Sequence, residues 1–135
     1  MIAAIPLLIL PFILYNIGVA GVFGTPGVAM LEQPVTSLVL PSRADWTMSV
    51  GDLLIVVALA ILFVEILKAT RASTRVLFDH MLSMVLFITF LVEFLLVANA
   101  ATDVFFILMT ISLIDVIAGF SVSMRTASRD VSIGL

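Results

Sequence analysis

The stretch LLIVVALAILFVEILKATRASTRVLFDHMLSMVLFITFLVEFLLVA, residues 53–98, decides the fold of this chain. It consists of two long apolar segments that are joined by a basic turn from Lys68 to Arg75. A bilayer core of about 30 Å needs about 20 helical residues, at a rise of about 1.5 Å each. Both segments reach that length, so we expect a membrane hairpin with spans from Gly51 to Thr70 and from Phe78 to Ala98.

The two spans are predicted to be helices. Lipid offers no water to backbone N–H and C=O groups, so a spanning segment must be a helix or a strand of a closed barrel. Barrel strands alternate apolar and polar residues, and these two runs do not alternate.

Composition favours a membrane protein over a soluble domain. Hydrophobic residues make up 63% of the 135 residues and charged residues 11%, against roughly a half and a quarter in soluble domains. A chain with no cysteine cannot form disulfides, thiolate metal sites or a cysteine nucleophile. A net charge of −3 argues against a nucleic-acid interface, which needs a basic face.

A third apolar span is expected from Ile2 to Phe23, and Pro11 should bend it. The alternative is a cleaved signal peptide, which would need a basic start and a small-residue cleavage site. No Lys or Arg precedes the run and no A-x-A pattern follows it, so we expect a retained span. Tyr15 and Asn16 lie in the middle of this span and should form a buried polar pair bonded to a neighbouring helix.

The segment from Gly24 to Val50 is the one long stretch predicted to lie outside the membrane. Val35 to Leu40 and Trp46 to Val50 are expected to be short strands of a β-hairpin on the membrane surface. Trp46 would then be an interfacial anchor, as tryptophan commonly is. A short surface helix over Gly27 to Gln33 is the alternative.

A fourth span is expected from Val104 to Met124, followed by a short polar tail. Asp52 should cap the second span, and Thr102 or Asp103 the fourth, because free N–H groups at a helix start attract side-chain oxygens.

The basic residues predict the orientation. Five of the six basic residues lie in the turn between the second and third spans or in the tail: Lys68, Arg71, Arg75, Arg125 and Arg129. On the opposite side of the membrane only Arg43 is expected. Because loops rich in Lys and Arg stay in the cytoplasm, both ends are predicted to be cytoplasmic and the hairpin extracytoplasmic.

Three acids lie within the predicted spans, namely Glu65, Glu93 and Asp115, and Lys68 lies near the cytoplasmic end. Each charge near the bilayer centre costs about 2.5–3.5 kcal/mol, so such residues face protein and find partners. Glu65 and Glu93 should lie about 7 Å from opposite ends of their spans, too far apart to pair. Asp115, by contrast, should reach toward Glu65 and Lys68.

Small and polar residues recur on one face of each of these spans. The stripes are Gly51, Ala58 and Glu65 in the second span, Thr89 and Glu93 in the third, and Ser112, Asp115 and Gly119 in the fourth. Such stripes mark close helix contacts. They suggest three roles: holding the bundle together, conducting a proton or ion past the three acids, or docking another membrane subunit.

Other chemistry has little support in the sequence. His80 has no second histidine or cysteine at ligand spacing, so we expect water or Asp79 as its neighbour and no metal. No Ser–His–acid arrangement and no phosphate-binding loop is present. We therefore predict no enzymatic activity and no cofactor.

Four strings carry a resemblance to a known group. They are Leu40-Pro41-Ser42 with Trp46 and Gly51-Asp52, Glu65-Ile-Leu-Lys68-Ala-Thr-Arg71, Val92-Glu93-Phe-Leu-Leu, and Asp115-Val-Ile-Ala-Gly119-Phe. The chain resembles small four-span inner-membrane proteins of proteobacteria that have no assigned function. The resemblance covers Gly24 to the C-terminus and implies a bacterial inner membrane, but no activity and no site.

The sequence thus predicts an all-α membrane protein, a four-helix transmembrane bundle with a short extracytoplasmic β-hairpin. It would be a non-enzymatic accessory subunit of a larger membrane complex or a self-associating bundle. Its partners would be the lipid bilayer and further copies or other membrane subunits, with assembly candidates Glu65, Lys68, Glu93, Asp115 and Asn16. The alternative is a small proton- or ion-coupled transporter or channel that uses the three acids.

Overall fold

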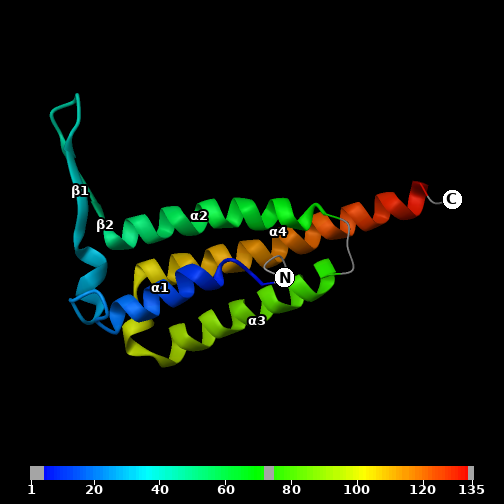
Figure 1. Cartoon of the computed structure of the whole chain (residues 1–135), viewed down its shortest axis with the longest axis horizontal. Coiled ribbons are helices and arrows are strands. Elements are labelled where there is room, and N and C mark those ends of the chain that lie inside the picture. Colours follow the sequence, from blue (N-terminus) through cyan, green and yellow to red (C-terminus); the bar gives the residue numbers. More distant parts are fainter. Residues whose placement is uncertain (1–4, 72–74, 134–135) are drawn as a thin grey trace.

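The computed structural model describes residues 5–71 and 75–133, which form helices and one small sheet. In chain order the elements are α1 Ile9–Val19, the 3-10 helix η2 Val28–Glu32, β1 Pro34–Val39, β2 Asp45–Ser49, α2 Val50–Ala69, α3 Arg75–Leu96, the 3-10 turn η3 Ala98–Ala100 and α4 Asp103–Ile133. The four α-helices run side by side, and the sheet projects from one end of the bundle (Figure 1). The predicted combination of four helices and a short hairpin is confirmed.

Three of the helices in the described residues are long and apolar enough to cross a membrane. They are α2, the part of α3 from Leu77 to Leu96, and the part of α4 from Asp103 to Val122. Their positions match the spans predicted at residues 51–70, 78–98 and 104–124 to within a few residues. Residues 72–74 of the predicted basic turn lie outside the described part of the chain.

The first helix is shorter than the predicted span over residues 2–23. α1 has 11 residues, about 16 Å at about 1.5 Å each, which is about half of a bilayer core. Residues 5–8 precede the helix, and residues 2–4 lie outside the described chain. Pro11 was expected to bend a helix that begins several residues earlier. Pro11 lies in the first turn of α1, where a backbone N–H has no intrahelical acceptor to lose.

Side-chain caps fix where α2 and α4 begin. The Ser49 side chain accepts a hydrogen bond from the Asp52 N–H at 3.2 Å, and the Asp52 carboxylate accepts one from the Ser49 N–H at 3.0 Å. This capping box confirms the predicted place of Asp52. At the start of α4, the Thr102 hydroxyl accepts from the Phe105 N–H at 3.2 Å, so Thr102 is the cap of the predicted pair.

The fourth helix continues past its predicted end at Met124. α4 has 31 residues, about 46 Å, and it extends beyond the other helices at the end opposite the hairpin (Figure 1). The tail that was expected to be a short polar segment is therefore helical up to Ile133.

Strands β1 and β2 form an antiparallel hairpin with two different faces. Leu38 pairs with Trp46, whereas Ser37 pairs with Thr47, and the two hydroxyls of the second pair are 2.9 Å apart. Because side chains alternate along a strand, Leu38, Trp46 and Met48 share one face, opposite Ser37 and Thr47. The predicted alternation is confirmed, except that Val50 begins α2. The short helix predicted as the alternative also exists, as η2 just before β1.

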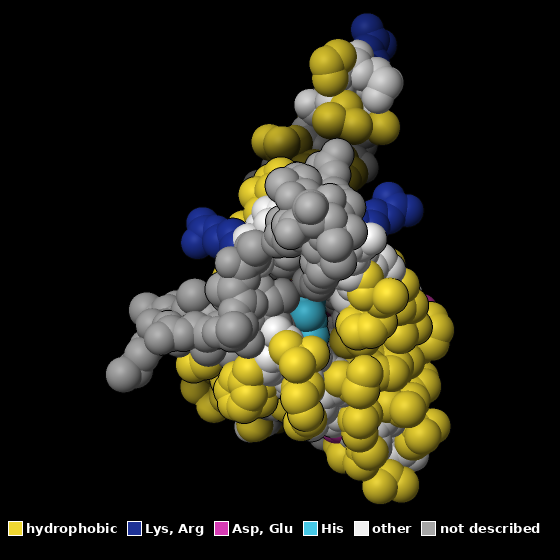
Figure 2. All heavy atoms as spheres, turned by 90° about the vertical axis from the view of Figure 1, so that its right-hand side faces the viewer, with side chains coloured by type: hydrophobic (Ala, Val, Ile, Leu, Met, Phe, Trp, Pro, Cys, Tyr) yellow, Lys and Arg dark blue, Asp and Glu magenta, His cyan; other side chains and the backbone are white. Residues whose placement is uncertain are grey.

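The core is built mainly from aromatic rings around α4. The Phe105 ring lies 4.9 Å from the ring of Tyr15 on α1 and 5.3 Å from that of Phe90 on α3, and all three side chains are buried. Phe12 adds an edge contact with Phe90 at 4.9 Å. Outside this core, the helices present apolar side chains, which cover much of the face in Figure 2.

Candidate functional site

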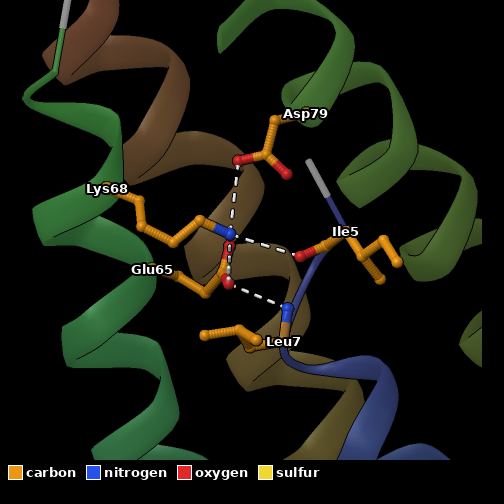
Figure 3. Close-up of polar contacts among 5 residues, drawn as sticks. All are labelled: Ile5, Leu7, Glu65, Lys68 and Asp79. Carbon is orange, nitrogen blue, oxygen red and sulfur yellow. Dashed lines mark hydrogen bonds and ion pairs between the residues drawn. The ribbon is translucent and has the colours of Figure 1, made fainter. Parts of the chain in front are cut away.

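One ammonium group joins two helices at the end of the bundle opposite the hairpin. Lys68 on α2 places its Nζ 3.1 Å from the Glu65 carboxylate and 3.6 Å from the carboxylate of Asp79 on α3 (Figure 3). Glu65 and Lys68 are three residues apart on α2, a spacing that places them on one helix face. Asp79 was not among the predicted partners of Lys68.

The same ion pair also binds the backbone that leads into α1. The Glu65 carboxylate accepts a hydrogen bond from the Leu7 N–H at 2.8 Å, and Lys68 Nζ donates one to the Ile5 carbonyl at 3.2 Å (Figure 3). Residues 5–8 are not helical, so their backbone groups need other partners. The charged pair supplies such partners at Ile5 and Leu7.

Asp115 on α4 is the third acid of this region. It is 5% exposed, forms a hydrogen bond with Ser83 on α3, and lies within electrostatic reach of Glu65, Lys68 and Asp79. The expected approach of Asp115 to Glu65 and Lys68 is confirmed. We call Glu65, Lys68, Asp79, Ser83 and Asp115 the inner cluster.

The predicted stripes on α2 and α4 lie inside the bundle. Gly51, Ala58 and Glu65 are all buried, and so are Ser112, Asp115 and Gly119. The stripe predicted on α3 is wrong at Thr89, which is exposed and donates its hydroxyl hydrogen bond to Val85 of its own helix.

Gly119 explains the position of His80. A Cβ atom added at Gly119 would lie 2.8 Å from Cε1 and 3.1 Å from Nδ1 of the His80 ring. The half-buried imidazole therefore packs directly on the α4 backbone, beside the inner cluster. Figure 2 shows the histidine side chain between the helices when the bundle is viewed from this end. Sequence reasoning missed this contact, although the small residue on the polar stripe of α4 was its signal.

A second polar group ties α1 to α3. Asn16 donates hydrogen bonds to the Glu93 carboxylate at 3.3 Å and to the Phe12 carbonyl at 3.1 Å. Glu93 lies 14 residues after Asp79 on α3, about 21 Å along the helix. The structure therefore does not bring Glu93 together with Glu65 and Asp115.

Tyr15 joins the second half of α1 to the turn before α4. Its hydroxyl donates to the Asn99 carbonyl at 2.6 Å and lies 2.8 Å from the Thr102 hydroxyl. The expectation that Tyr15 and Asn16 bond to neighbouring parts of the bundle is confirmed.

The inner cluster has more negative than positive groups. It contains three carboxyl groups and one ammonium group. Two buried oxygens of the cluster, Asp79 Oδ1 and Asp115 Oδ2, lack a hydrogen-bond partner within residues 5–71 and 75–133, and so does Ser112 Oγ, one turn from Asp115 on α4. No three acidic or histidine side chains in the described chain converge to hold a metal ion. The contacts of Lys68 with Glu65, Asp79 and Ile5 hold α2, α3 and the segment before α1 together.

Comparison with protein families, curated proteins and solved structures finds no match to this chain.

Proposed function

We propose that this chain is a non-enzymatic integral membrane protein that acts by lateral association, as an accessory subunit of a larger membrane complex or as a self-associating bundle. In this proposal all four α-helices lie in a bacterial inner membrane, with both chain ends in the cytoplasm. The half-length α1 runs from the segment bonded to Glu65 and Lys68 toward the hairpin end, and it packs against the three full-length helices.

The acids within the helices do not support docking through the helix faces. Glu65 is bonded to Lys68 and Leu7, Asp115 to Ser83, and Glu93 to Asn16. These groups find partners within the chain itself, so they hold the bundle together. A contact with another subunit has to be made elsewhere on the molecule.

The hairpin is the observation that carries the proposal. It stands nearly perpendicular to the helices and reaches sideways past α2 (Figure 1). All residues of β1 are exposed, and within the described chain each strand pairs only with the other. A two-stranded hairpin alone is marginally stable in water, and its outer edges are open to pairing with a further strand.

The faces of the hairpin suggest how it lies. If the helices stand upright in the bilayer, a perpendicular hairpin runs along the membrane surface. The face with Leu38, Trp46 and Met48 then meets the lipid interface, and the face with Ser37 and Thr47 meets water. The strand edges remain accessible to a neighbouring protein in the membrane plane.

Site-specific photocrosslinking in native membranes tests the proposal. A photoreactive residue at Ser37 should give one or a few discrete adducts, with twice the chain mass for self-association or a larger defined mass for another subunit. The control position is Thr89, which is exposed in the middle of α3 and should give mostly lipid adducts. Lipid adducts alone from Ser37, or the same protein adducts from both positions, would contradict the proposal.

A proton-coupled transporter is the second candidate, and one observation favours it. Asp115 Oδ2 is buried in a predicted span and has no hydrogen-bond partner in the described chain. Proton flux into vesicles containing the full chain should then disappear in Asp115→Asn and persist in Glu93→Gln, because Glu93 lies apart from the inner cluster. Absence of flux under every gradient would count against transport.

A further inference from the structure

We propose that Asp115 is a proton-binding site, which exchanges its proton with water at the end of the bundle where Asp79 and His80 lie. This inference does not depend on lateral association. It concerns what the inner cluster binds, and it holds whether or not the chain has a partner.

The first support is the environment of the Asp115 carboxyl group. Asp115 is 5% exposed and Ser112, one turn earlier on the same face of α4, is 1% exposed. Ser83 bonds to Asp115, but Asp115 Oδ2 and Ser112 Oγ have no partner in the described chain. A buried acceptor without a donor is costly, whereas a protonated carboxyl group becomes a donor and loses its charge.

The second support is the charge around Asp115. α2 contributes Glu65 and Lys68, and α3 contributes Asp79 and His80. The ammonium of Lys68 lies 3.1 Å from Glu65 and 3.6 Å from Asp79, so it already serves two carboxylates. The segment before α1 adds only backbone groups, from Ile5 and Leu7. Asp115, as the third carboxylate in this apolar region, has no cation of its own, so binding a positive charge stabilises it.

The third support is the kind of cation that fits. A metal ion needs several ligands at fixed distances, and no group of three acidic or histidine side chains in residues 5–71 and 75–133 provides them. A proton needs only one oxygen atom. Asp79 and His80 can pass this proton between Asp115 and water. Both lie about one helical turn before Ser83 on α3, toward the end seen in Figure 2.

Infrared spectroscopy of the full chain in lipid vesicles tests the proton directly. A protonated carboxyl group has a C=O stretching band that a carboxylate lacks, and side-chain ¹³C-labelled aspartate shifts this band for Asp but not for Glu. We expect an aspartic-acid band at neutral pH that is lost in Asp115→Asn. It should persist in Asp45→Asn, a matched change at an exposed position of the hairpin.

The Ser112→Ala variant keeps the carboxyl group and removes its neighbouring hydroxyl. Here the aspartic-acid band should remain but change frequency, because the surroundings of the protonated oxygen change. This variant decides the question if Asp115→Asn does not fold, as judged by its helical circular dichroism. Absence of an aspartic-acid band at neutral pH, a band that survives in folded Asp115→Asn, or a band unmoved by Ser112→Ala would each overturn the inference.

Discussion

Lys68 shows how a single residue can support several parts of this bundle. Its Nζ contacts the carboxylates of Glu65 and Asp79 and the carbonyl of Ile5, so one ammonium group connects α2, α3 and the segment before α1. Removing one member of a buried ionic group leaves the opposite charges buried without a partner. This loss destabilises the fold by more than the intact group stabilises it.

We therefore expect Lys68→Met to lower the free energy of unfolding by about 3 kcal/mol. Reversible unfolding in mixed micelles with increasing SDS measures this loss. Arg71→Met is the control, since Arg71 is exposed and its change should stay within about 0.5 kcal/mol. The double variant with Glu65→Gln should recover part of the loss, because it also removes an unpaired charge. Equal effects of the two single substitutions would show that Lys68 has no such role.

The Tyr15 hydroxyl offers a smaller test of the same kind. Tyr15→Phe keeps the ring contact with Phe105 but removes the bonds to Asn99 and Thr102, so we expect a loss of about 1 kcal/mol. Thr110→Val is the control, because the Thr110 hydroxyl bonds only back to its own helix at Phe106, as far as the described contacts go. The same unfolding assay should separate the two variants, and equal losses would mean that the contact does not stabilise the bundle.

At the scale of elements, hydropathy predicted those helices well whose length follows from a run of apolar residues. The spans at α2 and α3 depend on runs of apolar residues, and the Asp52 cap depends on local spacing, so both were predictable. The start of α1 was not, because it depends on Glu65 and Lys68, which are distant in sequence. The contact of His80 with Gly119 likewise exists only after α3 and α4 have packed.

The hairpin permits a prediction at this scale because Trp46 is the one tryptophan of the chain. If its face lies on the lipid interface, its fluorescence should be blue-shifted and quenched by brominated lipids in vesicles. Moving the tryptophan to the opposite face, with Trp46→Phe and Ser37→Trp together, should shift the emission to the red and favour quenching by aqueous iodide. The same spectrum for both proteins would rule out a hairpin that lies with one face on the membrane.

At the scale of the whole molecule, the two ends of the bundle differ in charge. The hairpin end carries Arg43, whereas the opposite end carries Lys68, Arg71 and Arg125, and Figure 2 shows basic side chains on both sides of that end. α4 extends beyond the other helices there, and Arg125 follows the end of its apolar part at Val122. This asymmetry favours the orientation with the hairpin outside the cytoplasm.

Cysteine labelling of intact cells tests this orientation, and a chain without native cysteine gives a clean background. Ala44→Cys places a thiol in the hairpin turn, and Ser128→Cys places one on the extended part of α4. A membrane-impermeant maleimide should label Ala44→Cys in bacteria whose outer membrane has been opened, and should label Ser128→Cys only after the inner membrane is permeabilised. Neither substitution changes a charge, so the positive-inside bias is preserved. The reverse labelling pattern would show that the bundle has the opposite orientation in the membrane. The inner cluster would then exchange protons with the outside of the cell instead of the cytoplasm.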